Sequence, residues 1–78
     1  DKRVDLTAMG TAIARRTKGV ALMGQTAARL AEIIAATPGR VTEASCPLPD
    51  FETAFCWVTE RSAPGDVILL SPGCASYD

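Results

Sequence analysis

The chain has 78 residues, of which 47% are hydrophobic, and eight basic residues against nine acidic ones give a formal net charge of −1. This length suits one small domain, and the apolar content excludes a disordered chain. Because the basic residues form no stripe that could neutralise a phosphate backbone, the sequence also excludes nucleic acid as an expected partner.

The first half of the chain predicts a helix, a strand and a second helix. Asp5 is a suitable N-cap for a helix whose apolar residues recur at helical spacing and which Gly19 can end. The apolar run at 20–23 is typical of a short strand buried on both faces. Thr26 can cap the next helix, and the sequence Thr-Pro-Gly at 37–39 ends it.

The second half repeats this alternation. Residues 41–44 predict a weak strand that contains a charge, which favours a place near the edge of a sheet. Asp50 begins the clearest helix, and its apolar stripe consists of Phe51, Ala54, Phe55 and Val58. A turn at 63–66 leads into a buried strand at 67–70. We expect residues 71–78 to form a loop at the carboxyl end of that strand.

Three helices alternating with three strands predict the α/β class, with right-handed crossovers and a mainly parallel sheet between two helical layers. The strand expected before the first helix is missing, so the sheet should be incomplete and residues 1–78 should be part of one larger domain. Ligands of such sheets bind outside the carboxyl ends of the strands. We therefore expect the segment before the first helix and the loop at 71–78 to lie at the same functional edge.

The familiar nucleotide-binding and catalytic motifs are absent. The turn at 23–26 has one glycine where a dinucleotide-binding turn has Gly-x-Gly-x-x-Gly, and the chain has no Gly-x-x-x-x-Gly-Lys-Ser/Thr phosphate loop. Cys74 follows a strand, but no histidine is present to generate its thiolate, so a packed thiol is the favoured interpretation. Ser71 and Ser76 lack both the Gly-x-Ser-x-Gly elbow and a general base.

The number and spacing of the cysteines indicate the metal content and the cellular compartment to expect. Three widely spaced cysteines and no histidine exclude a zinc site of the usual kinds. An odd number of cysteines without a secretion signal suits the reducing cytoplasm. No apolar run approaches the roughly 18–20 residues that span a bilayer, so no membrane association is expected.

Two polar residues remain as binding candidates. Ser76 can cap a helix or donate a hydrogen bond to an anion, and spacing alone favours neither. Lys2 precedes the first helix, where lysine is ordinarily a solvated surface residue. If both reach the carboxyl edge of the sheet, together they form a plausible site for a carboxylate.

Three stretches carry a resemblance to a known family. They are DKRVDL at 1–6, LMGQTA at 22–27 and PGDVILLSPGCASYD at 64–78. In order and spacing they resemble the carboxyl-terminal domain of the Mur ligase family. Their residue pattern is similar to that of the D-glutamate-adding members. The resemblance implies a Rossmann-like domain without dinucleotide binding. It also implies an ATP-dependent ligase of peptidoglycan biosynthesis, and so of cell shape and division, that joins D-glutamate to UDP-N-acetylmuramoyl-L-alanine.

The resemblance also implies site residues. Lys2 and Ser76 match positions that bind the D-glutamate carboxylate, and Tyr77 matches a position that contributes backbone contacts. ATP, Mg²⁺ and the UDP-linked substrate would be held mainly outside this chain, which alone should be inactive. The complete enzyme would be cytoplasmic and monomeric. The chain departs from the family's residue pattern at three positions. It has Arg3 where the family has a small residue, Gly73 where the family has alanine, and Tyr77 where the family has leucine or phenylalanine.

Two alternatives remain open from the sequence. One is a non-catalytic Rossmann-like binding module, which the absence of a catalytic base and a phosphate loop supports. The other is a related ligase that adds a different amino acid.

Overall fold

A computed structural model describes residues 5–71 and 73–78. The described residues form three helices and one four-stranded sheet, which confirms the α/β class. The elements in chain order are α1 (Leu6–Arg16), β1 (Gly19–Leu22), α2 (Ala27–Ala36), β2 (Glu43–Ala44), α3 (Phe51–Arg61), β3 (Ile68–Ser71) and β4 (Cys74–Tyr77).

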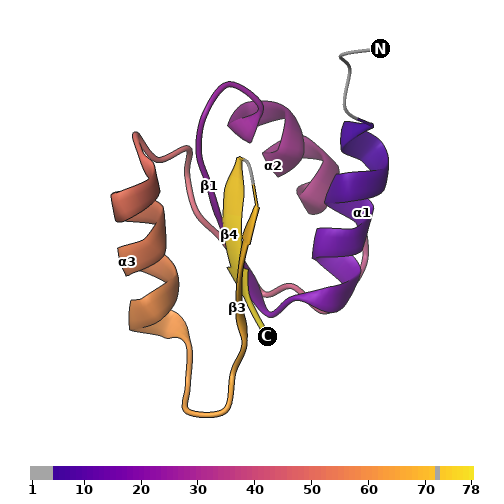
Figure 1. Ribbon diagram of the computed structural model, residues 1–78. Helices are drawn as coiled ribbons and strands as arrows, with labels where there is room; N and C mark the ends of the chain where they lie inside the picture. The colour runs from indigo at the N-terminus through magenta and orange to yellow at the C-terminus, as the bar shows by residue number, and fades with distance from the viewer. Residues whose placement is uncertain (1–4, 72) are drawn as a thin grey trace.

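The elements stack in three layers. Figure 1 shows α1 and α2 on one side of the sheet and α3 on the other. Helix α1 packs mainly on α2, while α3 packs on β1 and β4. The amino end of α1, the loop after β1 and the turn between β3 and β4 all lie at the same end of the molecule (Figure 1).

The sheet differs from the predicted one in its fourth strand. The strand order is β2-β1-β4-β3, in which β1 pairs parallel with β2 while β4 pairs antiparallel with both β1 and β3. Strands β2, β1 and β3 therefore share one direction, but the prediction of a mainly parallel sheet is wrong. The expected loop at 71–78 is also wrong, because Cys74–Tyr77 folds back as a strand between β1 and β3.

A tight turn and small side chains explain why β4 occupies this position. Gly73 has φ +93°, a conformation that side chains with a Cβ rarely adopt, and it reverses the chain directly after β3. All four residues of β4 are buried, as are all four of β1 beside it. Because the side chains of Cys74, Ala75 and Ser76 are small, the strand fits between the two helical layers.

The core has one part on each face of the sheet. On the α1 and α2 side the buried cluster is Ile13, Ala14, Val20, Leu22, Ala27, Leu30, Ile34 and Cys74. On the α3 side it is Ala21, Ala54, Val58, Ala75 and Tyr77. The alternation of Val20 and Leu22 with Ala21 between these clusters explains why β1 is apolar throughout, since a strand covered on both faces has no polar side.

The predicted helix starts are confirmed. The Asp5 carboxylate accepts the Ala8 N–H at 3.2 Å, and the Asp50 carboxylate accepts the Thr53 N–H at 2.8 Å. The apolar stripe of α3 is only partly buried: Ala54 and Val58 face the sheet, whereas Phe51 and Phe55 are exposed. The weak strand is confirmed as an edge strand, β2, with two residues.

Candidate functional site

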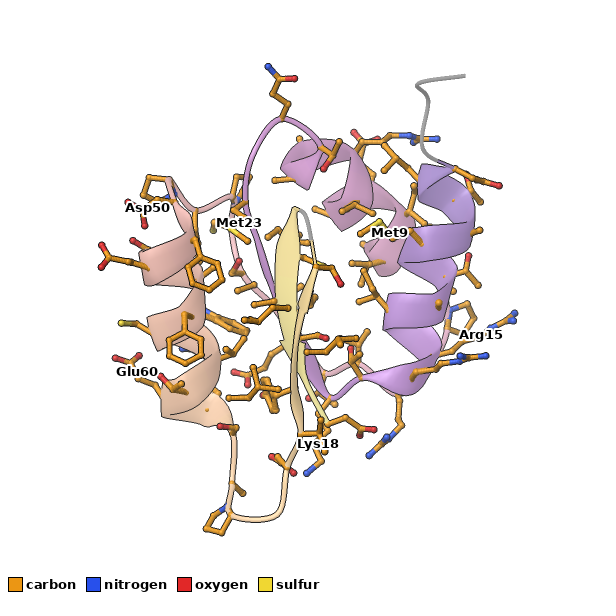
Figure 2. The ribbon with its side chains drawn as sticks, in the orientation of Figure 1. Met9, Arg15, Lys18, Met23, Asp50 and Glu60 are labelled. Atoms are coloured by element: carbon orange, nitrogen blue, oxygen red, sulfur yellow. The ribbon has the colours of Figure 1, made fainter. Side chains whose placement is uncertain are left out.

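A cavity lies where β1 ends, at the edge predicted to bind ligands. Its volume is about 310 Å³, and its lining is Leu6, Met9, Met23, Gly24, Gln25, Thr26 and Gly73. The wall therefore combines the start of α1, the loop between β1 and α2, and the turn between β3 and β4. The Met23 N–H donates to the Gly73 carbonyl at 3.0 Å, which fixes that turn against the end of β1. Figure 2 labels Met9 and Met23, which reach this cavity from α1 and from the end of β1.

Glycines bring the backbone close to this cavity. Gly24 has φ +79°, no atom lies within 4 Å of a Cβ added there, and the Ala27 N–H donates to its carbonyl at 3.3 Å. A Cβ added at Gly73 would lie 3.2 Å from Thr26 Oγ1. The two glycines thus allow the chain turns to approach one another around the start of α2.

The start of α2 borders this cavity. Thr26 is the N-cap residue, its side chain makes no capping hydrogen bond, and the first turn has no acidic residue. Backbone N–H groups at the start of a helix lack partners within the helix and carry partial positive charge. A carboxylate or phosphate oxygen is therefore the kind of group that this end of the cavity can hold.

Ser76 lies elsewhere, in a groove between α1 and the β3–β4 hairpin. It is 4% exposed and pairs with Val20 and Leu69 across the sheet. The groove holds two adjoining cavities of about 220 and 350 Å³, both lined by Arg16, Thr17, Leu69 and Ser76. Ser76 is thus beside the carboxyl-terminal half of α1, away from the cavity at the start of α2.

Tyr77 is a packing residue on the other face. Its ring fills the space that a Cβ at Gly19 would need, and it lies 6.5 Å from the Trp57 ring. Its hydroxyl donates to Glu43 Oε1 at 2.9 Å, and its carbonyl accepts the Lys18 N–H at 2.9 Å. Burial, with the neighbouring Glu43 carboxylate, raises the pKa of the Tyr77 phenol.

The two other candidate residues from the sequence are Lys2 and Cys74. Lys2 lies outside the described residues, so its meeting with Ser76 and the binding roles of Lys2, Ser76 and Tyr77 stay predictions. Cys74 is buried, and this burial raises the pKa of its thiol, which favours the protonated form. A protonated thiol is a poor nucleophile, in agreement with a packing role.

Sequence reasoning assigned no site role to Gln25, Thr26 or Arg16, which line these cavities. A signal for the first two was present, since Gly24 ends an apolar strand and Thr26 precedes a helix. Arg16 gave no comparable signal, because a basic residue in the last turn of a helix is explained by the helix dipole. Within the described part of the chain, no group of three or more acidic, cysteine or histidine side chains could hold a metal ion. None of the described helices is long and apolar enough to cross a membrane.

Several curated proteins that are similar to this chain carry the same name. The chain is 34% identical over 77 residues to UDP-N-acetylmuramoylalanine--D-glutamate ligase of Aromatoleum aromaticum, covering 99% of this chain and 16% of that protein. It is 35% identical over 77 residues to the ligase of the same name from Roseiflexus sp., with the same shares covered. The ligase of Lacticaseibacillus paracasei is 36% identical over 80 residues, covering 100% of this chain and 16% of that protein.

No family model and no solved structure matches the chain. The chain spans about 16% of the length of the curated relatives named above. The resemblance seen in three short stretches is confirmed, because the similarity runs along the whole chain. The chain accordingly belongs to the family of the UDP-N-acetylmuramoylalanine--D-glutamate ligases, to about one sixth of whose length it corresponds.

Proposed function

We propose that this chain is the D-glutamate-holding part of an ATP-dependent ligase of peptidoglycan biosynthesis. The observation that carries the proposal is the match of the whole chain to proteins named UDP-N-acetylmuramoylalanine--D-glutamate ligase. Residues 1–78 would then belong to a single Rossmann-like domain at the carboxyl end of that enzyme. The ligase would act in the cytoplasm, and the free thiols of all three cysteines suit a reducing compartment.

Lys2, Ser76 and Tyr77 are the proposed contacts to D-glutamate. D-Glutamate has two carboxylates, and hydrogen bonds between such groups and a cation or a hydroxyl are among the stronger ones in proteins. The Lys2 ammonium would supply the charge and Ser76 a neutral donor. Tyr77, whose carbonyl already accepts the Lys18 N–H, is kept as a contact on the family resemblance alone. Ser76 lines the groove beside Arg16, which gives that groove a polar floor and a cation at its rim.

The chain's contribution to the reaction would be positioning. The D-glutamate amine attacks an activated carboxyl carbon of the UDP-linked substrate, a C–N bond forms, and the activating group leaves with the electrons of the broken C–O bond. The amine loses a proton in the process. Holding the amine in line with that carbon is a proximity effect, which can supply several kcal/mol of the barrier reduction.

The described residues of this chain do not fit ATP or Mg²⁺. The sequence lacks a phosphate loop, and the described residues contain no cluster of three potential metal ligands. We propose that segments outside these 78 residues bind both and that the 78 residues alone catalyse no ligation. The UDP-linked substrate would likewise be held largely by those segments.

Steady-state kinetics of the complete ligase test the contacts. Lys2→Ala and Ser76→Ala should each raise the KM for D-glutamate by about tenfold or more, since each removes a hydrogen bond to a charged group. The KM for ATP should change far less. Ser62→Ala, the same chemical change at the C-cap of α3, is the control and should leave both constants unchanged. An unchanged KM for D-glutamate in both variants would overturn the assignment.

A further inference from the structure

The groove between α1 and the β3–β4 hairpin contains a hydroxyl that the described fold does not use. Ser76 is 4% exposed and lines both cavities of the groove, and its Oγ makes no hydrogen bond to another described residue. The neighbouring Thr17 hydroxyl is engaged, since it donates to the Ile13 carbonyl at 2.8 Å. A hydroxyl withdrawn from bulk water gains most from a partner, so Ser76 is suited to bond a polar group that enters the groove.

A cation lies beside this hydroxyl. Arg16 lines the same two cavities, and its guanidinium forms no ion pair with an acidic residue of the described part of the chain. The basic residues that do form such pairs are Lys18, Arg29, Arg40 and Arg61. The backbone of Arg16 is nevertheless fixed, because its carbonyl accepts a hydrogen bond from Arg40 Nη1 at 3.2 Å. The guanidinium is therefore available to an anion in the groove.

The other side chains of the groove do not offset this charge. In the smaller cavity, the residues around Arg16 are uncharged and largely apolar, among them Ile13 and Leu69. Asp78 lines the larger cavity, and its carboxylate pairs with Arg40. The groove thus combines a positive charge with a neutral donor, which is the arrangement that a carboxylate prefers.

The charge of D-glutamate requires a second cation. The amine attacks without its extra proton, so the reacting amino acid carries two negative carboxylates and no positive charge. The contacts proposed above include one cation, Lys2. A carboxylate that leaves water for an apolar groove without a cation beside it is strongly disfavoured. Arg16 would supply the missing charge.

The direction of the amine decides which carboxylate enters the groove. In the proposed function the UDP-linked substrate is held largely by segments outside these 78 residues, so the amine must point out of the groove toward it. The side-chain carboxylate is the charged group farthest from the amine along the carbon chain of D-glutamate. It is therefore the group that reaches Ser76 and Arg16.

We propose that Arg16 is a specificity-determining residue that pairs with the side-chain carboxylate of D-glutamate, to which Ser76 donates a hydrogen bond. The planar guanidinium donates two parallel hydrogen bonds to a carboxylate and gains charge attraction that a neutral amide does not offer. Arg16 thereby favours D-glutamate over its uncharged analogue D-glutamine. This inference rests on the proposed function and names the residue that recognises the side chain of the substrate.

Steady-state kinetics of the complete ligase test the pairing. Arg16→Gln should raise the KM for D-glutamate by about tenfold or more and leave the KM for ATP unchanged. Arg16→Lys keeps the charge without the two parallel donors and should raise it less. Arg15→Gln is the matched control, because Arg15 is an exposed residue of the same last turn of α1 and lines neither cavity. It should leave the KM for D-glutamate unchanged. An unchanged KM in Arg16→Gln, or an equal rise in Arg15→Gln, would overturn the inference.

Competition by D-glutamine tests the choice of carboxylate. Because D-glutamine lacks the side-chain charge, it should inhibit D-glutamate ligation with the same Ki in wild type and in Arg16→Gln. A higher Ki in the variant would mean that Arg16 contacts a group that both amino acids share, which contradicts the assignment.

The failure of this inference is distinguishable from the failure of the proposed function. A complete ligase that does not use D-glutamate would refute the proposed function before any variant is compared. A raised KM for D-glutamate in Ser76→Ala, with an unchanged one in Arg16→Gln, would refute the role of Arg16 alone.

Discussion

At the residue scale, two of the residues that depart from the family's pattern hold β4 in its position. Gly73 supplies the positive φ of the turn, and Tyr77 fills the space over Gly19 and donates to Glu43. From the sequence, both residues were recognised as departures from the family's pattern, but no structural role could be predicted for either. Their contacts explain them in physical terms, since a hairpin needs a reversal and an anchor at its far end.

Gly73→Ala should destabilise the chain by about 1–2 kcal/mol, the cost of a Cβ in a left-handed conformation. The added Cβ would also press on Thr26 Oγ1, 3.2 Å away. Urea denaturation gives the free energy of unfolding of both proteins. Gly65→Ala is the matched comparison, because Gly65 also has a positive φ, +95°, but no atom within 4 Å of the added Cβ. A free energy for Gly73→Ala equal to wild type would show that the turn does not need glycine.

Asp66→Asn should lower stability at neutral pH and make it less dependent on pH. The Ala63 N–H and the Lys18 ammonium lower the pKa of the Asp66 carboxyl below its ordinary 3.8 in the folded chain. A lowered folded pKa stabilises the fold above the ordinary value, and this contribution is lost as pH falls through the folded pKa. Thermal melts from pH 7 down to pH 2 would therefore show the wild-type and variant Tm converging on acidification. Parallel curves would contradict the ion pair's role.

At the element scale, the helices were predictable and the fourth strand was not. Asp5 and Asp50 follow local capping rules, and the spacing of the apolar residues defined α2 and the buried face of α3. The sequence Cys-Ala-Ser-Tyr of β4 has neither the β-branched residues nor the alternation that indicates a strand. Its strand state depends on the position between β1 and β3, which is a tertiary property that local patterns do not encode.

Hydrogen exchange measures that tertiary property directly. The amides of Cys74–Tyr77 lie between two strands and should be protected nearly as well as those of β1. The Gly65 amide, in the exposed turn at 63–66, should exchange far faster. Exchange of β4 at the rate of that turn would mean that the residues behave as the loop that the sequence predicted.

The same distinction explains how much of the candidate site could be predicted. The functional edge followed from the strand directions, and a cavity lies there, between the starts of α1 and α2. Ser76 was expected at that edge but lies in the groove beside Arg16, because β4 carries it back along the sheet. The shared direction of β1, β2 and β3 thus followed from local patterns, whereas the direction of β4 and the position of its residues after the reversal did not.

At the scale of the whole molecule, the described residues form a three-layer unit with a cavity at the end of β1 and a groove between α1 and the β3–β4 hairpin. Of the proposed D-glutamate contacts, Ser76 and Arg16 line the groove.

An amino-acid specificity assay of the complete ligase that contains this chain tests the central claim most directly. Phosphate release would be followed with ATP, UDP-N-acetylmuramoyl-L-alanine and one amino acid at a time. The account predicts release that depends on D-glutamate and is at least about a hundredfold faster than with L-glutamate, because the carboxylate contacts discriminate by geometry. Release that is independent of D-glutamate, or that prefers another amino acid, would contradict it.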